Sequence, residues 1–347
     1  MLAGFKRVGT LILGAGLALS LSTANAAPEF TLKLHHLLGP KAPAHTKMLM
    51  PWAEGIEKAS NGRVKIEIYP AMSLGGKPPE LIRQVQDGVV DIVWTVNGYT
   101  SGLFPRSEVF ELPFIHTNDT VATNLAIREM FDKYLAPEYR SVHVLFNHVH
   151  AGQGIHMVDQ VVRKPEDLAG KKIRIPTRTG AWIIEALGAN PVGMPVPALP
   201  QALSKKVVDG AFIPWEIIPP LKLQELTKYQ IEGANKTRFG TTVFQVSMNK
   251  DTWAGLPKDI QKIFTDASGE DWVREVGKIW EGADDFGIGL AVKAGNEHIT
   301  LTEAETDAFR IALEPVINRW IVDVQKKGIN GAALVEAARA AIAKHSK

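Results

Sequence analysis

Hydrophobic and polar positions alternate with the two-residue period of a β-strand in three stretches, residues 30–35, 62–69 and 170–176. Two nearly apolar runs, 89–94 and 207–215, predict buried strands, and both begin with Val-Val-Asp. Each run follows an alternating stretch and an intervening segment with helical periodicity. The order strand, helix, strand therefore occurs twice, which predicts two α/β lobes.

Helical periodicity dominates the C-terminal part of the chain. It continues from residue 258 to about residue 295. Thr302 and Glu305 then have the spacing of a capping box, which predicts a further long helix through Val324. Long helices after two α/β lobes are expected to brace one lobe against the other.

The first 26 residues have the pattern of a secretory signal peptide. Lys6 and Arg7 precede an apolar run, and Ala24-Asn25-Ala26 follows it, which predicts cleavage after Ala26. A retained N-terminal anchor is the alternative, but the run is short for a bilayer. We expect export to the periplasm and no stable membrane insertion of the mature chain.

The charge balance and the cysteine content limit the classes of partner and site that the chain could have. The chain has 39 Lys and Arg residues, of which Lys6 and Arg7 lie in the predicted signal peptide, and 37 Asp and Glu residues, all of which lie outside it. This near balance argues against nucleic acid or an anionic membrane as the main partner. The absence of cysteine excludes a thiolate metal site and a cysteine nucleophile.

Sequence motifs of enzymes are missing. The chain contains no Walker loop, GxGxxG or GxSxG motif. His148, His150 and His156 could bind a metal, because residues i and i+2 of a strand share a face, but Asp159 is the only nearby carboxylate. Histidines that form hydrogen bonds are favoured. We therefore expect a protein without enzymatic activity, cofactor or metal.

Aromatic residues near predicted strand ends are candidate ligand contacts, because loops beyond the carboxyl ends of strands bind ligands in open α/β sheets. His36 at the end of the first strand is a further candidate. The candidates of this kind are His36, Trp94, Tyr99, Phe212 and Trp215. Three other tryptophans, Trp272, Trp280 and Trp320, are expected in the core.

The stretch GKKIRIP contains the cation that most needs explaining. Ile173 and Ile175 point to one face of the predicted strand, while Lys172 and Arg174 point to the other. Lys172 is easily solvated at the start of the strand, whereas Arg174 lies between two isoleucines. Arg174 either pairs with a structural carboxylate or binds an anionic ligand.

The run LAGKKIRIPTRTGAWIIEALGANPVGMPVPALPQALSKKVVDGAFIPW, with NGRVKIEIYPAMSLGG, QVQDGVVDIVW and LPFIHTND, resembles the solute-binding receptors of tripartite ATP-independent periplasmic (TRAP) transporters, dicarboxylate-binding-protein-like branch. The resemblance covers almost all of the mature chain in the same motif order. It implies a two-lobed periplasmic-binding-protein fold of the α/β class with a long helix that spans both lobes. It also implies closure around an organic acid, which is delivered to a sodium-driven membrane permease.

The predicted division gives lobe I residues 28–151 and about 240–280, and lobe II residues 152–239 and about 281–347. Hinges are expected where the chain crosses between lobes, near His150 to Gly154 and near Arg238 to Thr241.

The resemblance also implies that Arg174 clamps the ligand carboxylate, since the family's arginine lies in a G-x-K-x-R-x-P strand. A planar guanidinium offers two parallel donors that match a carboxylate, which Lys172 could not do.

Departures from the family pattern indicate an apolar pocket. Ile213 stands where many relatives that bind sugar acids have a polar residue. Val96 stands where receptors of the sialic-acid type carry an acid, and the strand where a second cation is common offers only Gly154 and His156. The predicted walls are Trp94, Val96, Val196, Phe212, Ile213 and Trp215.

An apolar pocket with one arginine suits an aromatic or otherwise hydrophobic monocarboxylate. Arg238 near the second crossing either holds a second anionic or hydroxyl group or is a solvated or ion-paired arginine. The alternatives are a receptor for a C4-dicarboxylate or sugar acid, an exported enzyme on the same scaffold, and a sensor subunit that presents its ligand to a membrane kinase.

Overall fold

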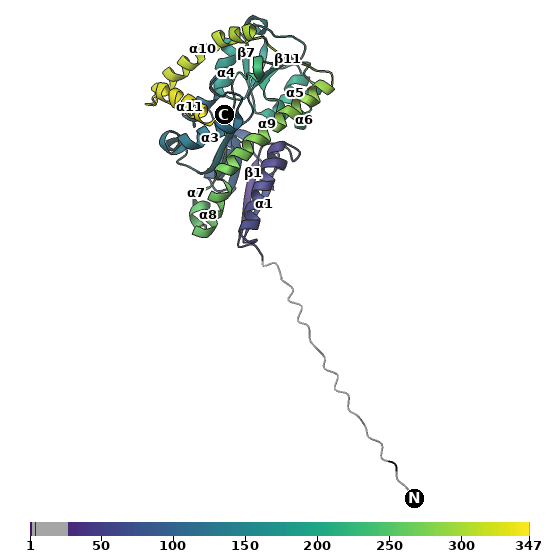
Figure 1. Cartoon of the computed structure of the whole chain (residues 1–347), viewed down its shortest axis with the longest axis vertical. Coiled ribbons are helices and arrows are strands. Elements are labelled where there is room, and N and C mark those ends of the chain that lie inside the picture. Colours follow the sequence, from purple (N-terminus) through teal and green to yellow (C-terminus); the bar gives the residue numbers. More distant parts are fainter. Residues whose placement is uncertain (2–3, 5–26, 347) are drawn as a thin grey trace.

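The computed structural model describes residues 1, 4 and 27–346. The predicted signal peptide therefore lies outside the described residues, apart from Met1 and Gly4. Two β-sheets, each covered by helices, form two lobes that are joined along their length by the helix α9 (Figure 1). The predicted fold class is confirmed.

The first lobe contains a five-stranded sheet in the order β2-β1-β3-β10-β4. β1 runs parallel to β2 and β3, whereas β10 lies antiparallel between β3 and β4. Its strands are β1 (Phe30–His36), β2 (Val64–Tyr69), β3 (Ile92–Val96), β4 (His143–Val149) and β10 (Val243–Met248).

The second lobe contains a six-stranded sheet in the order β11-β9-β5-β8-β6-β7. β6 runs parallel to β7 and β8, β11 runs parallel to β9, and β5 is antiparallel to β8 and β9. Its strands are β5 (Gly154–Met157), β6 (Lys172–Ile175), β7 (Asn190–Gly193), β8 (Gly210–Ile213), β9 (Tyr229–Glu232) and β11 (Glu297–Thr300).

The α-helices cover the faces of these sheets, and none in the described part of the chain is long and apolar enough to span a membrane. They are α1 (Met50–Ala59), α2 (Leu81–Gln86), α3 (Thr120–Met130), α4 (Arg178–Ala186), α5 (Leu199–Ser204), α6 (Ile218–Leu221), α7 (Lys250–Gly255), α8 (Lys258–Ala267), α9 (Glu270–Lys293), α10 (Glu303–Gln325) and α11 (Gly331–His345).

Most predicted elements form, with some shifts at their boundaries. The periodic segment from residue 258 is two helices, α8 and α9, because the chain is extended at Gly269, which caps the start of α9. The capping box before α10 is confirmed: the Glu305 N–H donates to Thr302 Oγ1, and the Thr302 N–H donates to the Glu305 carboxylate. The strand predicted from residue 89 begins only at Ile92 as β3. Val89 is exposed and lies in the turn that precedes this strand.

The chain crosses between the sheets at two adjacent segments, after β4 and before β10. The Gln153 N–H donates to the Gly240 carbonyl over 2.7 Å, and the Phe239 N–H donates to the Gln153 carbonyl over 3.1 Å. Gly152 has φ +107°, and a Cβ there would overlap the Arg238 side chain. The two segments predicted as hinges therefore lie side by side.

The C-terminal helices divide between the lobes. β11 joins the second sheet and α10 packs against α4 of the second lobe, but α11 packs against α3 of the first lobe. The predicted division placed all of residues 281–347 in the second lobe. The last helix returns to the first lobe instead, so the lobes share a further connection (Figure 1).

α9 approaches both lobes closely because two of its glycines lack a side chain. A Cβ at Gly277 would lie 2.8 Å from Cα of Val121 in α3. A Cβ at Gly287 would overlap the carbonyl of Trp215 in η9 (Trp215–Ile217). These contacts fix the helix against one lobe near its start and against the other lobe near its end.

We expect Gly287→Ala to destabilise the protein by about 1–3 kcal/mol, the usual cost of overpacking a tight contact. The matched control is Gly289→Ala in the same helix, which is exposed with no atom within 4 Å of its Cβ position. Because alanine favours helix over glycine, this control should be neutral or stabilising by up to about 1 kcal/mol. Urea unfolding of the two variants is the measurement, and equal stabilities would contradict the close-contact account.

Candidate ligand-binding site

A small cavity of about 40 Å³ lies between the two lobes, where the carboxyl ends of the parallel strands meet. Five strands end at this cavity or continue into loops that reach it, namely β1, β3, β6, β7 and β8. Its lining is Leu37, Leu38, Trp94, Val96, Tyr99, His150, Gln153, Arg174, Pro176, Val196, Ile213, Pro214, Glu216, Ile217, Thr242, Phe244 and Trp280.

Arg174 supplies a buried cation to this cavity. Its side chain is 2% exposed, Nε donates to the Met194 carbonyl over 3.1 Å, and Nη1 donates to the Phe212 carbonyl over 3.4 Å. Nη2 has no hydrogen-bond partner, and no carboxylate forms a salt bridge with Arg174 in the part of the chain that the structure describes. Burial lowers the pKa of Arg174, whereas the nearby Tyr99 hydroxyl raises it, and a guanidinium remains charged in proteins.

Such a guanidinium is oriented by two carbonyl dipoles and still lacks a counter-charge. A buried charge is costly unless it is paired, so an anion that reaches the free edge of Arg174 gains a strong charge-assisted interaction.

Tyr99 joins the two lobes beside Arg174. Its hydroxyl oxygen accepts a hydrogen bond from the Val196 N–H over 2.8 Å, and Gly98 packs against Thr177 of the second lobe. Burial raises the pKa of Tyr99, and the positive charge of Arg174 acts in the opposite direction. These contacts between opposite lobes describe a closed cleft.

Stacked aromatic rings form the first-lobe wall of the cavity. The ring centroids of Trp94 and Phe244 are 5.2 Å apart with nearly parallel planes, and those of Phe244 and Trp280 are 5.8 Å apart. The Trp94 indole N–H donates to His148 Nε2 over 2.9 Å, which fixes the ring. The cavity thus presents flat apolar surface close to a single cation.

Six of the candidate ligand contacts lie on the cavity wall: Trp94, Val96, Tyr99, Arg174, Val196 and Ile213. Five do not: His36, His156, Phe212, Trp215 and Arg238.

Each side chain outside the wall packs against other parts of the protein, although both ring nitrogens of His156 are buried without a hydrogen-bond partner in the described part of the chain. His36 lies 2.9 Å from His45 in a hydrogen bond between ring nitrogens. Phe212 packs in the second-lobe core and reaches the site only through its carbonyl oxygen. The rings of His156 and Trp215 are 4.6 Å apart, behind the cavity.

Arg238 is a buried ion-paired residue. It is 3% exposed, and Nη2 lies 2.8 Å from Asp284 and 2.9 Å from Glu232. Its guanidinium also covers the Trp215 ring at 4.1 Å. Two carboxylates already neutralise this cation, so we do not include Arg238 in the proposed site.

The histidines considered as metal ligands make other contacts. His148 accepts from Trp94, and His150 Nδ1 accepts from the Gly152 N–H over 3.0 Å. Burial lowers the pKa of His148 to about 3. Within residues 1, 4 and 27–346, no three His, Asp or Glu side chains are grouped as a metal site.

Several lining residues were not predicted from the sequence. Trp280 was assigned to the core, and it is indeed buried, but α9 also brings it to the cavity. Gln153 and Glu216 are polar residues in short connections, and no local pattern marks them. The order of the strands brings them to the cavity.

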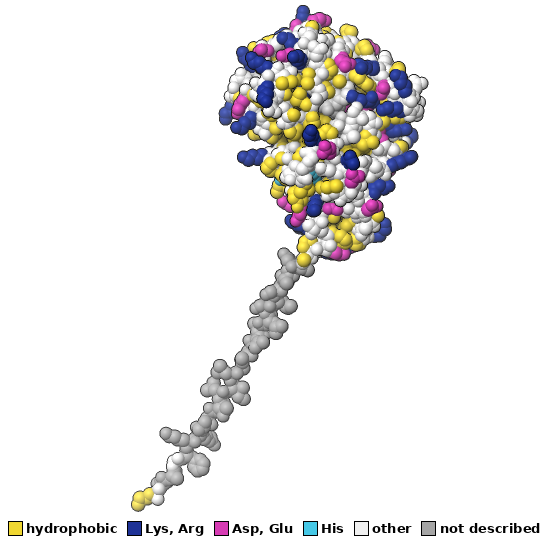
Figure 2. All heavy atoms as spheres, turned by 180° about the vertical axis from the view of Figure 1, so that it is seen from behind, with side chains coloured by type: hydrophobic (Ala, Val, Ile, Leu, Met, Phe, Trp, Pro, Cys, Tyr) yellow, Lys and Arg dark blue, Asp and Glu magenta, His cyan; other side chains and the backbone are white. Residues whose placement is uncertain are grey.

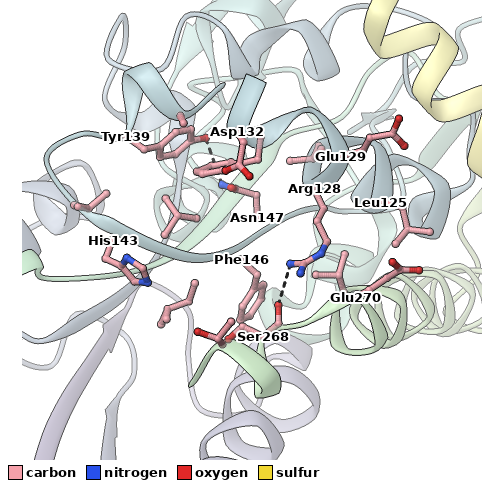
Figure 3. A pocket seen from close by; sticks show the side chains of 18 of the residues that line it. Leu125, Arg128, Glu129, Asp132, Tyr139, His143, Phe146, Asn147, Ser268 and Glu270 are labelled. Carbon is pink, nitrogen blue, oxygen red and sulfur yellow. Dashed lines mark hydrogen bonds between the residues drawn. The ribbon is translucent and has the colours of Figure 1, made fainter. Parts of the chain in front are cut away.

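A larger open hollow lies on the outside of the first lobe, beside α3 and β4 (Figure 3). Both of the basic side chains Lys344 and Arg128 have partners there: Lys344 pairs with Glu129 over 2.9 Å, and Arg128 Nη1 donates to the Ser268 carbonyl over 3.4 Å. Basic and acidic side chains are also interspersed over the face in Figure 2. This hollow therefore lacks the buried unpaired cation of the interlobe cavity.

Two α/β lobes with a cavity between them define a two-lobed binding protein. The profile of a family described as bacterial extracellular solute-binding protein, family 7, matches residues 34–323. The chain belongs to this family.

Three similar proteins are informative. A marine-metagenome TRAP solute-binding protein specific for aromatic acid ligands, crystallised with 3-hydroxybenzoate, is 41% identical with a TM-score of 0.90, over 92% of this chain and 100% of that chain. A TRAP solute-binding protein of Rhodoferax ferrireducens T118 with copurified benzoate is 39% identical with a TM-score of 0.88, over 91% and 98%. The C4-dicarboxylate-binding periplasmic protein DctP of Rhodobacter capsulatus is 28% identical over 73% of this chain and 75% of its own.

We expect Arg238→Ala to lower the free energy of unfolding by roughly 3–5 kcal/mol, because it leaves two buried carboxylates without their cation. Lys236→Ala is the control, since the Lys236–Asp285 pair is exposed and should contribute little. Thermal unfolding of both variants tests this. Arg238→Ala with the stability of Lys236→Ala would show that the ion pair has no structural role.

Proposed function

We propose that this protein is the periplasmic receptor of a TRAP transporter, exported by the signal peptide in residues 1–26, and that it captures an aromatic or otherwise hydrophobic monocarboxylate. The ligand carboxylate binds Arg174, and its apolar body lies against Trp94, Phe244 and Trp280. The receptor carries out no chemistry and delivers the acid to the membrane permease subunits.

The observation that carries this proposal is the unpaired edge of Arg174 in an otherwise largely apolar cavity. A carboxylate offers two acceptor oxygens to the guanidinium, and a planar ring complements the aromatic wall.

The relatives support the same ligand class. The two receptors with benzoate and 3-hydroxybenzoate are 39% and 41% identical to this chain, whereas the C4-dicarboxylate receptor is 28% identical. A dicarboxylate or sugar acid would need further donors, and Arg238, the second candidate cation, is held by Asp284 and Glu232. We therefore favour the aromatic acid over these alternatives.

Ligand binding and closure are coupled through the two walls of the cavity. Arg174 belongs to the second lobe, and Trp94 and Tyr99 belong to the first, so a ligand gains both sets of contacts only when the cleft is closed. The paired segments around Gly152 and Gly240 act as the hinge, and α9 bends or shifts with them. Closure gives the permease a means to distinguish the loaded receptor from the empty one.

The test is isothermal titration of residues 27–347 with benzoate and related aromatic acids. We expect Arg174→Ala to weaken binding by at least about a hundredfold, since two charge-assisted hydrogen bonds are lost, each contributing about 1.5–3 kcal/mol. Arg174→Lys should restore only part of this loss, because an ammonium cannot bind the two oxygens in parallel.

Lys172→Ala is the matched control, because Lys172 lies two residues earlier on the same strand and is exposed. It should bind as the wild type does. Unchanged affinity in a folded Arg174→Ala variant would refute the clamp, and conversion of the bound acid to a product would favour the enzyme hypothesis.

A further inference from the structure

The cavity contains more polar groups than a purely hydrophobic acid would use. Besides Nη2 of Arg174, Oε1 of Gln153 and Oε2 of Glu216 are buried without a hydrogen-bond partner in the described part of the chain. Gln153 is 1% exposed and Glu216 is 3% exposed. Since buried polar atoms are nearly always hydrogen-bonded, both oxygens need a partner that a ligand in this cavity could supply.

Gln153 is held in a fixed position at the hinge. Its Nε2 donates to Thr242 Oγ1 over 2.8 Å, and its backbone bonds to Phe239 and Gly240 of the neighbouring segment. With the amide nitrogen occupied in this way, Oε1 remains as an acceptor for a donor inside the cavity.

Glu216 comes from η9, on the side of the cavity next to α9. The preceding Trp215 N–H donates to Asp284 of α9 over 3.1 Å, so η9 is anchored there. Burial raises the pKa of Glu216 well above its usual value, and the nearby Asp284 carboxylate raises it further, against the opposite effect of Arg238. A shift in this direction favours the protonated carboxyl group, which can both donate and accept a hydrogen bond.

We propose that Gln153 and Glu216 form a second polar subsite that recognises a hydroxyl group on the ring of the ligand, so that the ligands are hydroxy-substituted aromatic monocarboxylates. A hydroxyl can donate to Gln153 Oε1 and accept from Glu216. This inference rests on the proposed function and specifies the substrate class of the same cavity.

A second carboxylate would fit this subsite less well than a hydroxyl. Gln153 presents an acceptor oxygen, and a carboxylate has no hydrogen to donate to it. An aromatic ring without a polar substituent would leave both oxygens without a hydrogen bond, which lowers the affinity for such a ligand.

The experiment is isothermal titration of the wild type with benzoate, with its hydroxy-substituted derivatives and with the corresponding methyl-substituted derivatives. The methyl group matches the size of a hydroxyl but forms no hydrogen bond. We expect at least one hydroxy isomer to bind about tenfold or more tightly than both benzoate and its methyl analogue. This comparison needs no variant and cannot be affected by misfolding.

Three variants then test the residues. Glu216→Leu and Gln153→Met should each bring the ratio of hydroxy-acid affinity to benzoate affinity down to about one, whatever their effect on benzoate affinity itself, whereas Glu216→Gln, which can still donate and accept, should retain most of this ratio. Equal wild-type affinity for the hydroxy, methyl and unsubstituted acids would overturn this inference alone. A preference that survives both apolar substitutions would also overturn it, and the absence of binding by any aromatic acid would overturn the proposed function with it.

Discussion

The guanidinium of Arg174, buried without a carboxylate partner, is the constraint around which the cavity is organised. Its two bonds to the carbonyls of Met194 and Phe212 fix its orientation but leave its charge uncompensated. Burial of such a group is unfavourable unless an anion is supplied. When the cleft of the empty receptor is open, water can solvate the free edge of Arg174. The unfavourable free energy of burying this charge therefore falls mainly on the state that is closed and empty. An anionic ligand removes that cost, which is how one residue can link binding to closure.

Arg238, the other buried arginine between the lobes in the described part of the chain, is neutralised within the protein. Arg238 pairs with Asp284 of α9 and with Glu232, and this ion pair ties the long helix to the crossing segment. Close packing at Gly277 and Gly287 holds the same helix against each lobe in turn. The interlobe region thus combines a structural set of charges with one cation that is available to a ligand.

The sequence predicted the two lobes, the strand that carries Arg174 and the apolar walls at Val96 and Ile213, because local periodicity and family motifs encode these features. It did not show which strand-end aromatics face the cleft. Trp94 lies within β3 and lines the cavity, whereas Trp215, just after β8, lies outside the cavity wall, because Arg238 covers its ring and α9 packs on its backbone.

Nor could the polar residues of the site be predicted from the sequence. Gln153 lies on the cavity because two chain crossings run side by side, which is a long-range property of the fold. Trp280 was expected in the core, and only the path of α9 through both lobes brings its ring to the cavity. Sequence patterns describe each element well, but sites between lobes depend on how distant elements meet.

The most direct test of the account compares an aromatic acid that binds the wild-type receptor with its carboxamide, by isothermal titration under the same conditions. The two molecules have nearly the same size and shape, but only the acid carries a negative charge for Arg174. The account predicts that the carboxamide binds at least about a hundredfold more weakly than the acid, because the buried cation stays unpaired. Comparable affinities would contradict it and would mean that the aromatic wall alone holds the ligand.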